Sequence, residues 1–173
     1  MAKWGMPTTL AAASGKLLVT VDGRVDVFNS IPTVSGAAAD VAVGANGFVV
    51  QVDECAADDL AGVAGIFVVN GKLLVADSGH SRVLIWNSIP TASGTPADLV
   101  LGQADFTHCL RNGGGGLSAS TLDKPVDVWT DGTRVAVVDM INQRVHIAGG
   151  SEPRRRAAAV HGAPLSRRCG RGR

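Results

Sequence analysis

Short runs of alternating apolar and polar residues follow one another along most of the chain. In "RVDVF" (24–28), Val25 and Val27 fall on one side of an extended chain and Asp26 on the other. In "RVHI" (144–147) the apolar residues again flank a polar one, His146. A period of two is that of a β-strand rather than a helix. The pattern therefore predicts short strands.

The boundaries between these runs carry turn residues. Asn70-Gly71 and Asp131-Gly132 each separate two apolar runs, and Ser14-Gly15 holds the corresponding place near the start. Such dipeptides supply the positive φ angles of a two-residue hairpin turn. We expect antiparallel hairpins at all three places.

Much of the sequence is repeated. "FNSIPTVSGAAADVAVG" (28–44) returns as "WNSIPTASGTPADLVLG" (86–102), and "KLLVADSGHSRVLI" (72–85) returns as "RVAVVDMINQRVHI" (134–147). The repeats divide the chain into units of about 7–53, 60–110 and 122–147, the last incomplete. A small sheet cannot bury both of its faces alone, but sheets stacked around an axis can, as in a β-propeller. We predict an all-β fold, a partial β-propeller of about three four-stranded blades, followed by an irregular basic C-terminal tail at 148–173.

The stretch "LLVADSGHSRVLIW" (73–86) resembles an NHL repeat, in which an apolar strand, an Asp, a polar turn, an Arg and a second apolar strand follow in order. The resemblance covers about 7–147 and is to the bacterial long-repeat NHL proteins. It implies a propeller, commonly six-bladed, and an exported or cell-surface location. Three units would make half a ring, so we expect a piece of a longer protein. Pairing of two chains into one ring, or failure to fold stably, are the alternatives.

A pair of charged residues recurs with the repeat. Asp77 and Arg82 align with Asp139 and Arg144, and Arg24 aligns with Arg82 although the first unit has a shorter loop. A catalytic site is usually singular, whereas a repeated ion pair indicates a part of the scaffold. We expect each Arg to bind the Asp through two parallel hydrogen bonds and to brace the loop between strands.

No catalytic, cofactor-binding or metal-binding residue is predicted. "DSGHS" (77–81) contains Asp, Ser and His, but neighbours on one turn do not converge as a hydrolase triad must. His80, His108 and His146 form no ring of ligands in the aligned repeats and are expected at the surface. The hypothesis is therefore a non-enzymatic scaffold that binds a protein or a small ligand. The alternative is a remnant of a propeller lyase or hydrolase whose active site needs further blades.

The three cysteines, Cys55, Cys109 and Cys169, form no metal-binding spacing. A bridge between Cys55 and Cys109 is open, but we expect buried free thiols. The aligned Phe28 and Trp86 are expected in the core.

Charge separates the repeats from the tail. Up to Gly150 the chain has 9 Lys and Arg against 14 Asp and Glu, and after it 7 Arg against 1 Glu. The tail is best explained as a frameshifted segment; a solvated tail and a nucleic-acid-binding arm are the alternatives.

No apolar run reaches the roughly 18 residues of a membrane helix. Expected partners are an unknown protein or small ligand, with self-association through the open end blades, and not nucleic acid.

Overall fold

The computed structural model describes residues 7–21, 23–44 and 55–149. Strands account for most of the ordered elements, and a short 3₁₀ helix, η1 (Arg111–Gly114), is the one helical element in these ranges. The strands form three separate antiparallel sheets, which we call blades 1, 2 and 3. The predicted all-β fold, with sheets arranged as the blades of a partial propeller, is confirmed.

Each blade is a meander in which neighbouring strands follow chain order. Blade 1 contains β1 (Pro7–Ala13), β2 (Lys16–Val21), β3 (Arg24–Phe28) and β4 (Val41–Val43). Blade 2 contains β5 (Val63–Val69), β6 (Lys72–Asp77), β7 (Arg82–Trp86) and β8 (Leu99–Leu101). Blade 3 has three strands in the described residues, β9 (Pro125–Thr130), β10 (Arg134–Asp139) and β11 (Arg144–Gly149).

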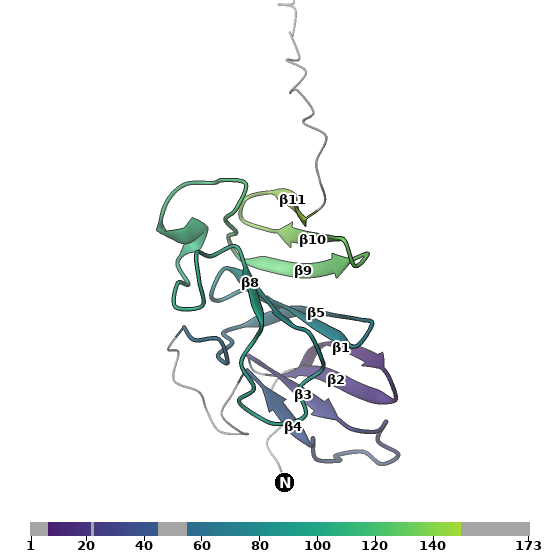
Figure 1. The fold of residues 1–173 in the computed structure, drawn as a ribbon. Helices are drawn as coiled ribbons and strands as arrows, with labels where there is room; N and C mark the ends of the chain where they lie inside the picture. Colours follow the sequence, from purple (N-terminus) through teal and green to yellow (C-terminus); the bar gives the residue numbers. More distant parts are fainter. Residues whose placement is uncertain (1–6, 22, 45–54, 150–173) are drawn as a thin grey trace, which may run out of the picture.

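The blades lie one after another in space, in the order of the sequence (Figure 1). The first strands of successive blades are neighbours, β1 beside β5 and β5 beside β9. One hydrophobic core lies between blades 1 and 2 and a second between blades 2 and 3. Among the described residues no hydrogen-bonded ladder joins one blade to the next, so packing of the sheet faces holds the blades together.

Two of the three hairpin predictions are confirmed. Ala13 pairs with Lys16 and Val69 pairs with Lys72, so Ser14-Gly15 and Asn70-Gly71 are two-residue turns. Both residues of each turn have positive φ, as this turn type requires.

The third hairpin differs from the prediction. Thr130 pairs with Val135, so Asp131-Gly132 is not a two-residue turn. The Asp131 carboxylate accepts hydrogen bonds from the backbone N–H groups of Thr133 (2.9 Å) and Arg134 (2.7 Å). These bonds stabilise a wider turn and lower the pKa of Asp131 to about 2.

The Pro, Ser and Gly residues of the repeated segment at 87–96 predict an exposed connection. In the first unit Ile31 is 52% exposed, but in the second its counterpart Ile89 is only 8% exposed. Ile89 belongs to the core between blades 1 and 2, and its N–H donates to the carbonyl of Gly71 (2.8 Å). In blade 2 this connection is partly buried because it packs against blade 1.

Candidate functional site

A buried arginine organises the loops of blade 2. Arg82 is fully buried, and its Nε donates to Asp77 Oδ2 at 2.8 Å. Its Nη1 donates to the carbonyl of Phe106 (2.8 Å), and its Nη2 to those of Ala56 (2.9 Å) and Asp59 (2.7 Å). The predicted pairing with two parallel bonds to Asp77 is therefore wrong. Arg82 instead ties the segments that precede and follow the blade to its centre.

The same network returns in blade 3. Arg144 Nε donates to Asp139 Oδ2 at 2.8 Å. Its Nη1 donates to the carbonyl of Ser118 (2.8 Å) and its Nη2 to that of Thr121 (2.5 Å), the counterparts of Ala56 and Asp59. The other oxygen of each Asp accepts a backbone N–H at 2.8 Å. Four bonds are equivalent in the two repeats, and this recurrence gives the pair the geometry of a scaffold part.

Arg24 contacts a carboxylate in its own strand. Its Nε and Nη2 donate to the two carboxylate oxygens of Asp26 at 2.6 and 3.3 Å, within the same strand. The first unit lacks the Asp-to-Arg loop, and Val21 pairs directly with Arg24 at the end of the β2–β3 hairpin.

His80 is buried, which corrects the prediction of a surface histidine. Only 2% of the residue is exposed, and Nδ1 lies 2.9 Å from Asp77 Oδ2. The same oxygen accepts from Arg82, so His80 is a member of the buried network rather than a group that faces solvent. In blade 3 Asn142 takes its place, with Nδ2 donating to Asp139 at 2.8 Å.

The other two histidines differ from each other. His108 lies at the surface, as predicted, and its Nδ1 lies 2.7 Å from Asp105 Oδ1. His146 is 9% exposed because it faces blade 2, which again corrects the prediction. Burial and the nearby Arg144 cation lower its pKa. Within the described ranges no group of three or more His, Cys, Asp or Glu side chains has metal-binding geometry.

Cys55 and Cys109 form a disulfide bond, with a Cα–Cα separation of 6.0 Å. The expectation of free thiols in this pair is therefore wrong. Cys55 precedes β5 and Cys109 follows β8, so the fold brings the two ends of blade 2 together. Spacing along the sequence could not reveal this contact. Cys169 and the tail predicted for 148–173 lie outside the described residues, apart from Ala148 and Gly149 at the end of β11.

The outward face of blade 3 is apolar and exposed. Val145 is 63% exposed and Ile147 is 49% exposed, whereas their counterparts Val83 and Ile85 in blade 2 are 0% and 7% exposed. We call this surface the outer face; it is formed by Trp129, Val138, Val145 and Ile147, which are each at least 42% exposed. The period of two in "RVHI" was thus read correctly, but the polar side is the one that packs.

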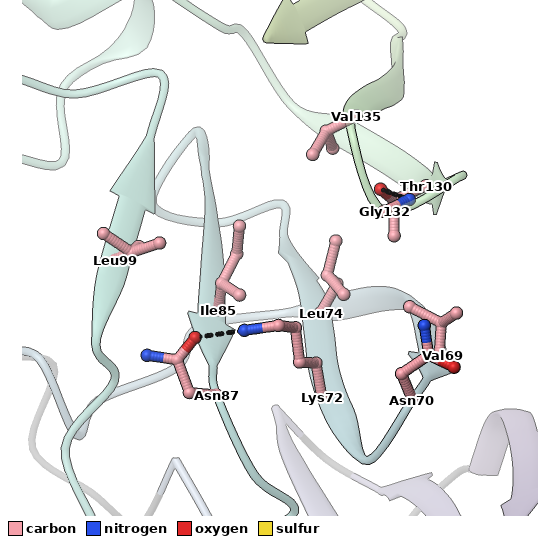
Figure 2. A pocket seen from close by; sticks show the side chains of 10 residues that line it. All are labelled: Val69, Asn70, Lys72, Leu74, Ile85, Asn87, Leu99, Thr130, Gly132 and Val135. Carbon is pink, nitrogen blue, oxygen red and sulfur yellow. Dashed lines mark hydrogen bonds between the residues drawn. The ribbon is translucent and has the colours of Figure 1, made fainter.

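A cavity of about 280 Å³ opens between blades 2 and 3 (Figure 2). Its walls are mainly the apolar side chains of Leu74, Ile85, Leu99 and Val135. At its edge Lys72 Nζ donates a hydrogen bond to Asn87 Oδ1. We call this space the interblade cavity; its further lining residues are Val69, Asn70, Thr130 and Gly132.

The cavity was not predicted, although the sequence contained a sign of it. The third unit loses Trp86, the last residue of β7 in the second unit, and Ala148 stands in its place. Ala148 pairs with Val135, as Trp86 pairs with Leu73. A substitution of Trp by Ala in an aligned repeat is a signal that could have located the space.

No helix in the described part of the chain is long and apolar enough to span a membrane.

Comparisons with known proteins add no family: no protein-family model and no curated protein matches the chain.

Proposed function

We propose that the chain is an NHL-type propeller segment that acts as a non-enzymatic binding scaffold. The repeated Asp and Arg side chains support this proposal because their hydrogen bonds are used within the loops that they brace. His80 likewise faces Asp77 in the interior and has no open side for a substrate.

The outer face of blade 3 is the binding surface, and its exposure is the observation that carries the proposal. The equivalent faces of blades 1 and 2 are each covered by the next sheet, and their Val25 and Val83 are fully buried. Burial of apolar surface contributes about 25 cal/mol per Å². A second sheet with an apolar face therefore fits the outer face best.

Blade 1 of another copy offers such a sheet. Leu10 on β1 is 66% exposed, whereas its counterpart Ile66 in blade 2 packs against blade 1 and is 7% exposed. A contact between the outer face of one copy and β1 of the next would repeat the contacts between blades inside the chain. It is a head-to-tail contact. Such a contact closes into a ring or continues into an open filament, depending on the rotation that relates neighbouring copies.

Sedimentation velocity over a concentration series tests this function. We expect the chain to associate, and Val145→Lys and Leu10→Lys each to weaken association at least about tenfold, about 1.4 kcal/mol. Thr133→Lys, at an exposed hairpin position, is the matched control and should leave it unchanged. A wild-type chain that stays monomeric at its highest soluble concentration would count against the proposal. Association that responds equally to all three variants would do the same.

A further inference from the structure

We propose that the interblade cavity binds a small planar aromatic molecule of about the size of indole. The protein itself shows that such a ring fits, because the equivalent crevice between blades 1 and 2 already holds an indole ring. That ring belongs to Trp86, which is 1% exposed within the core between those blades.

The walls of the two crevices are formed by apolar side chains at equivalent positions. Leu74, Ile85 and Leu99 of the interblade cavity correspond to Leu18, Val27 and Val41 of blade 1, and all three counterparts are in the core between blades 1 and 2. On the opposite wall Val135 corresponds to Leu73, which is in the same core. The walls are thus retained from one crevice to the next.

The filling side chains differ between the two crevices. Trp86 and Ile89 fill the first, but Ala148 stands at the Trp86 position in blade 3. The residue that aligns with Ile89 is Ser151, outside the described residues. Cavities left by a large-to-small change in an apolar surrounding stay dry and accept small aromatic molecules.

Size and chemistry restrict the ligand. A volume of about 280 Å³ lies just below the roughly 300–1,000 Å³ of pockets for drug-sized ligands, which favours one or two rings. The apolar walls favour a neutral ring, and the edge beside Lys72, Asn70 and Asn87 offers polar atoms (Figure 2). In the first crevice the indole N–H of Trp86 donates to the carbonyl of Thr95 at 2.9 Å, so a polar edge beside a ring has a precedent in this chain.

Indole is the probe for the test, with the full chain labelled at its methyl groups. We expect a dissociation constant of the order of 0.1–1 mM, measured by NMR titration. The methyl signals of Leu74, Ile85 and Val135 should shift most. Ala148→Trp should weaken binding at least tenfold, because the introduced ring fills the space.

Val34→Trp is the control. It adds the same ring at an exposed position of the connection between β3 and β4, which belongs to neither the interblade cavity nor the outer face, and indole binding should change less than twofold. If Ala148→Trp does not fold, as judged by circular dichroism, Val135→Leu replaces it; this variant introduces the residue found at the equivalent Leu73 and should weaken binding about threefold or more.

Two results would overturn the inference: no shift of the wall methyl groups at several-millimolar indole, or binding by folded Ala148→Trp as tight as by the wild-type chain. The cavity and the outer face lie on opposite sides of blade 3. A wild-type chain that associates but does not bind indole would refute the cavity site alone. A wild-type chain that binds indole but does not associate would refute the proposed function alone.

Discussion

At the scale of single residues, the loops depend on buried side chains that satisfy several backbone groups at once. The Arg82 guanidinium donates to one carboxylate and three carbonyls. The side chain is fully buried, so water cannot replace these bonds. A buried charge that loses its partner leaves an uncompensated charge in a medium of low dielectric constant. Stability therefore depends on this residue more than its single ion pair would indicate.

Arg82→Ala should lower the free energy of unfolding by about 3–5 kcal/mol, since it leaves Asp77 buried without its cation. Arg144→Ala removes an equivalent network, but the Arg144 side chain is 25% exposed, so water can partly replace the lost bonds and the effect should be smaller. Urea unfolding of both variants measures the difference. An equal or larger effect of Arg144→Ala would contradict this account.

His146 makes the stability depend on pH. Its pKa is lowered in the folded protein, by burial first and by Arg144 second. The unfolded chain therefore takes up a proton first as the pH falls below about 6.5, and the free energy of unfolding should fall with it. His146→Leu introduces the residue found at the equivalent Leu84. The free energies of unfolding at pH 5 and pH 8 should then differ less. The variant should also raise the free energy of unfolding by about 0.5–2 kcal/mol. Urea unfolding at the two pH values measures both effects, and an unchanged pH dependence would exclude His146 as the cause.

At the scale of strands and turns, each blade is connected to the next at a glycine. Gly102 follows β8 with a φ of +92°, and it bridges to Thr121 before blade 3. A Cβ at this position would lie 2.6 Å from Cδ1 of the fully buried Leu122. Gly44 meets Leu60 in the same way after β4. The close approach of the connection to the next core thus excludes any side chain.

Gly102→Ala should lower the free energy of unfolding by about 3 kcal/mol or more, because a positive φ and a steric clash act together. Gly71→Ala is the control: its φ is +77°, but no atom lies within 4 Å of the added Cβ, so only the conformational cost of about 1–2 kcal/mol applies. Thermal and urea unfolding of the two variants separate these terms. Equal losses would show that the contact with Leu122 carries no cost.

The strands could be predicted from the sequence because they depend on local patterns. The alternation around Val25 and the turn at Asn70-Gly71 each reflect a property of a few neighbouring residues. The burial of His80, the Cys55–Cys109 bond and the interblade cavity depend on segments that are distant in the chain. The Asp131 turn was missed because a side chain, rather than the dipeptide, determines its width.

At the scale of the whole molecule, stability comes from the packing between blades. Trp86 is the largest side chain in the core between blades 1 and 2 that is almost fully buried. The two cores are separate, so a change in one crevice leaves the other intact. The fold is thus a chain of contacts between nearest neighbours, as expected for a repeat protein.

Trp86→Ala should cost about 3–5 kcal/mol and open a second cavity like that between blades 2 and 3. Trp129→Ala is the matched control, since Trp129 is 50% exposed on the outer face and contacts the ring of Phe67 only at a centroid distance of 6.3 Å. Its cost should be below about 1.5 kcal/mol. Unfolding experiments compare the two, and similar losses would show that interblade packing is not the main source of stability.

The disulfide bond makes the stability of blade 2 depend on the redox conditions around it. Cys55 and Cys109 are 54 residues apart and enclose all four strands of the blade, and the carbonyls of the adjacent Ala56 and of Phe106 are bound by Arg82. Reduction should lower the free energy of unfolding by about 2–4 kcal/mol. Dithiothreitol should lower the melting temperature of the wild-type chain but not that of a Cys55→Ser, Cys109→Ser variant. Thiol-rich surroundings such as those of a cytosol would keep the bond open, so this chain reaches its full stability where oxidants, rather than glutathione, set the thiol balance.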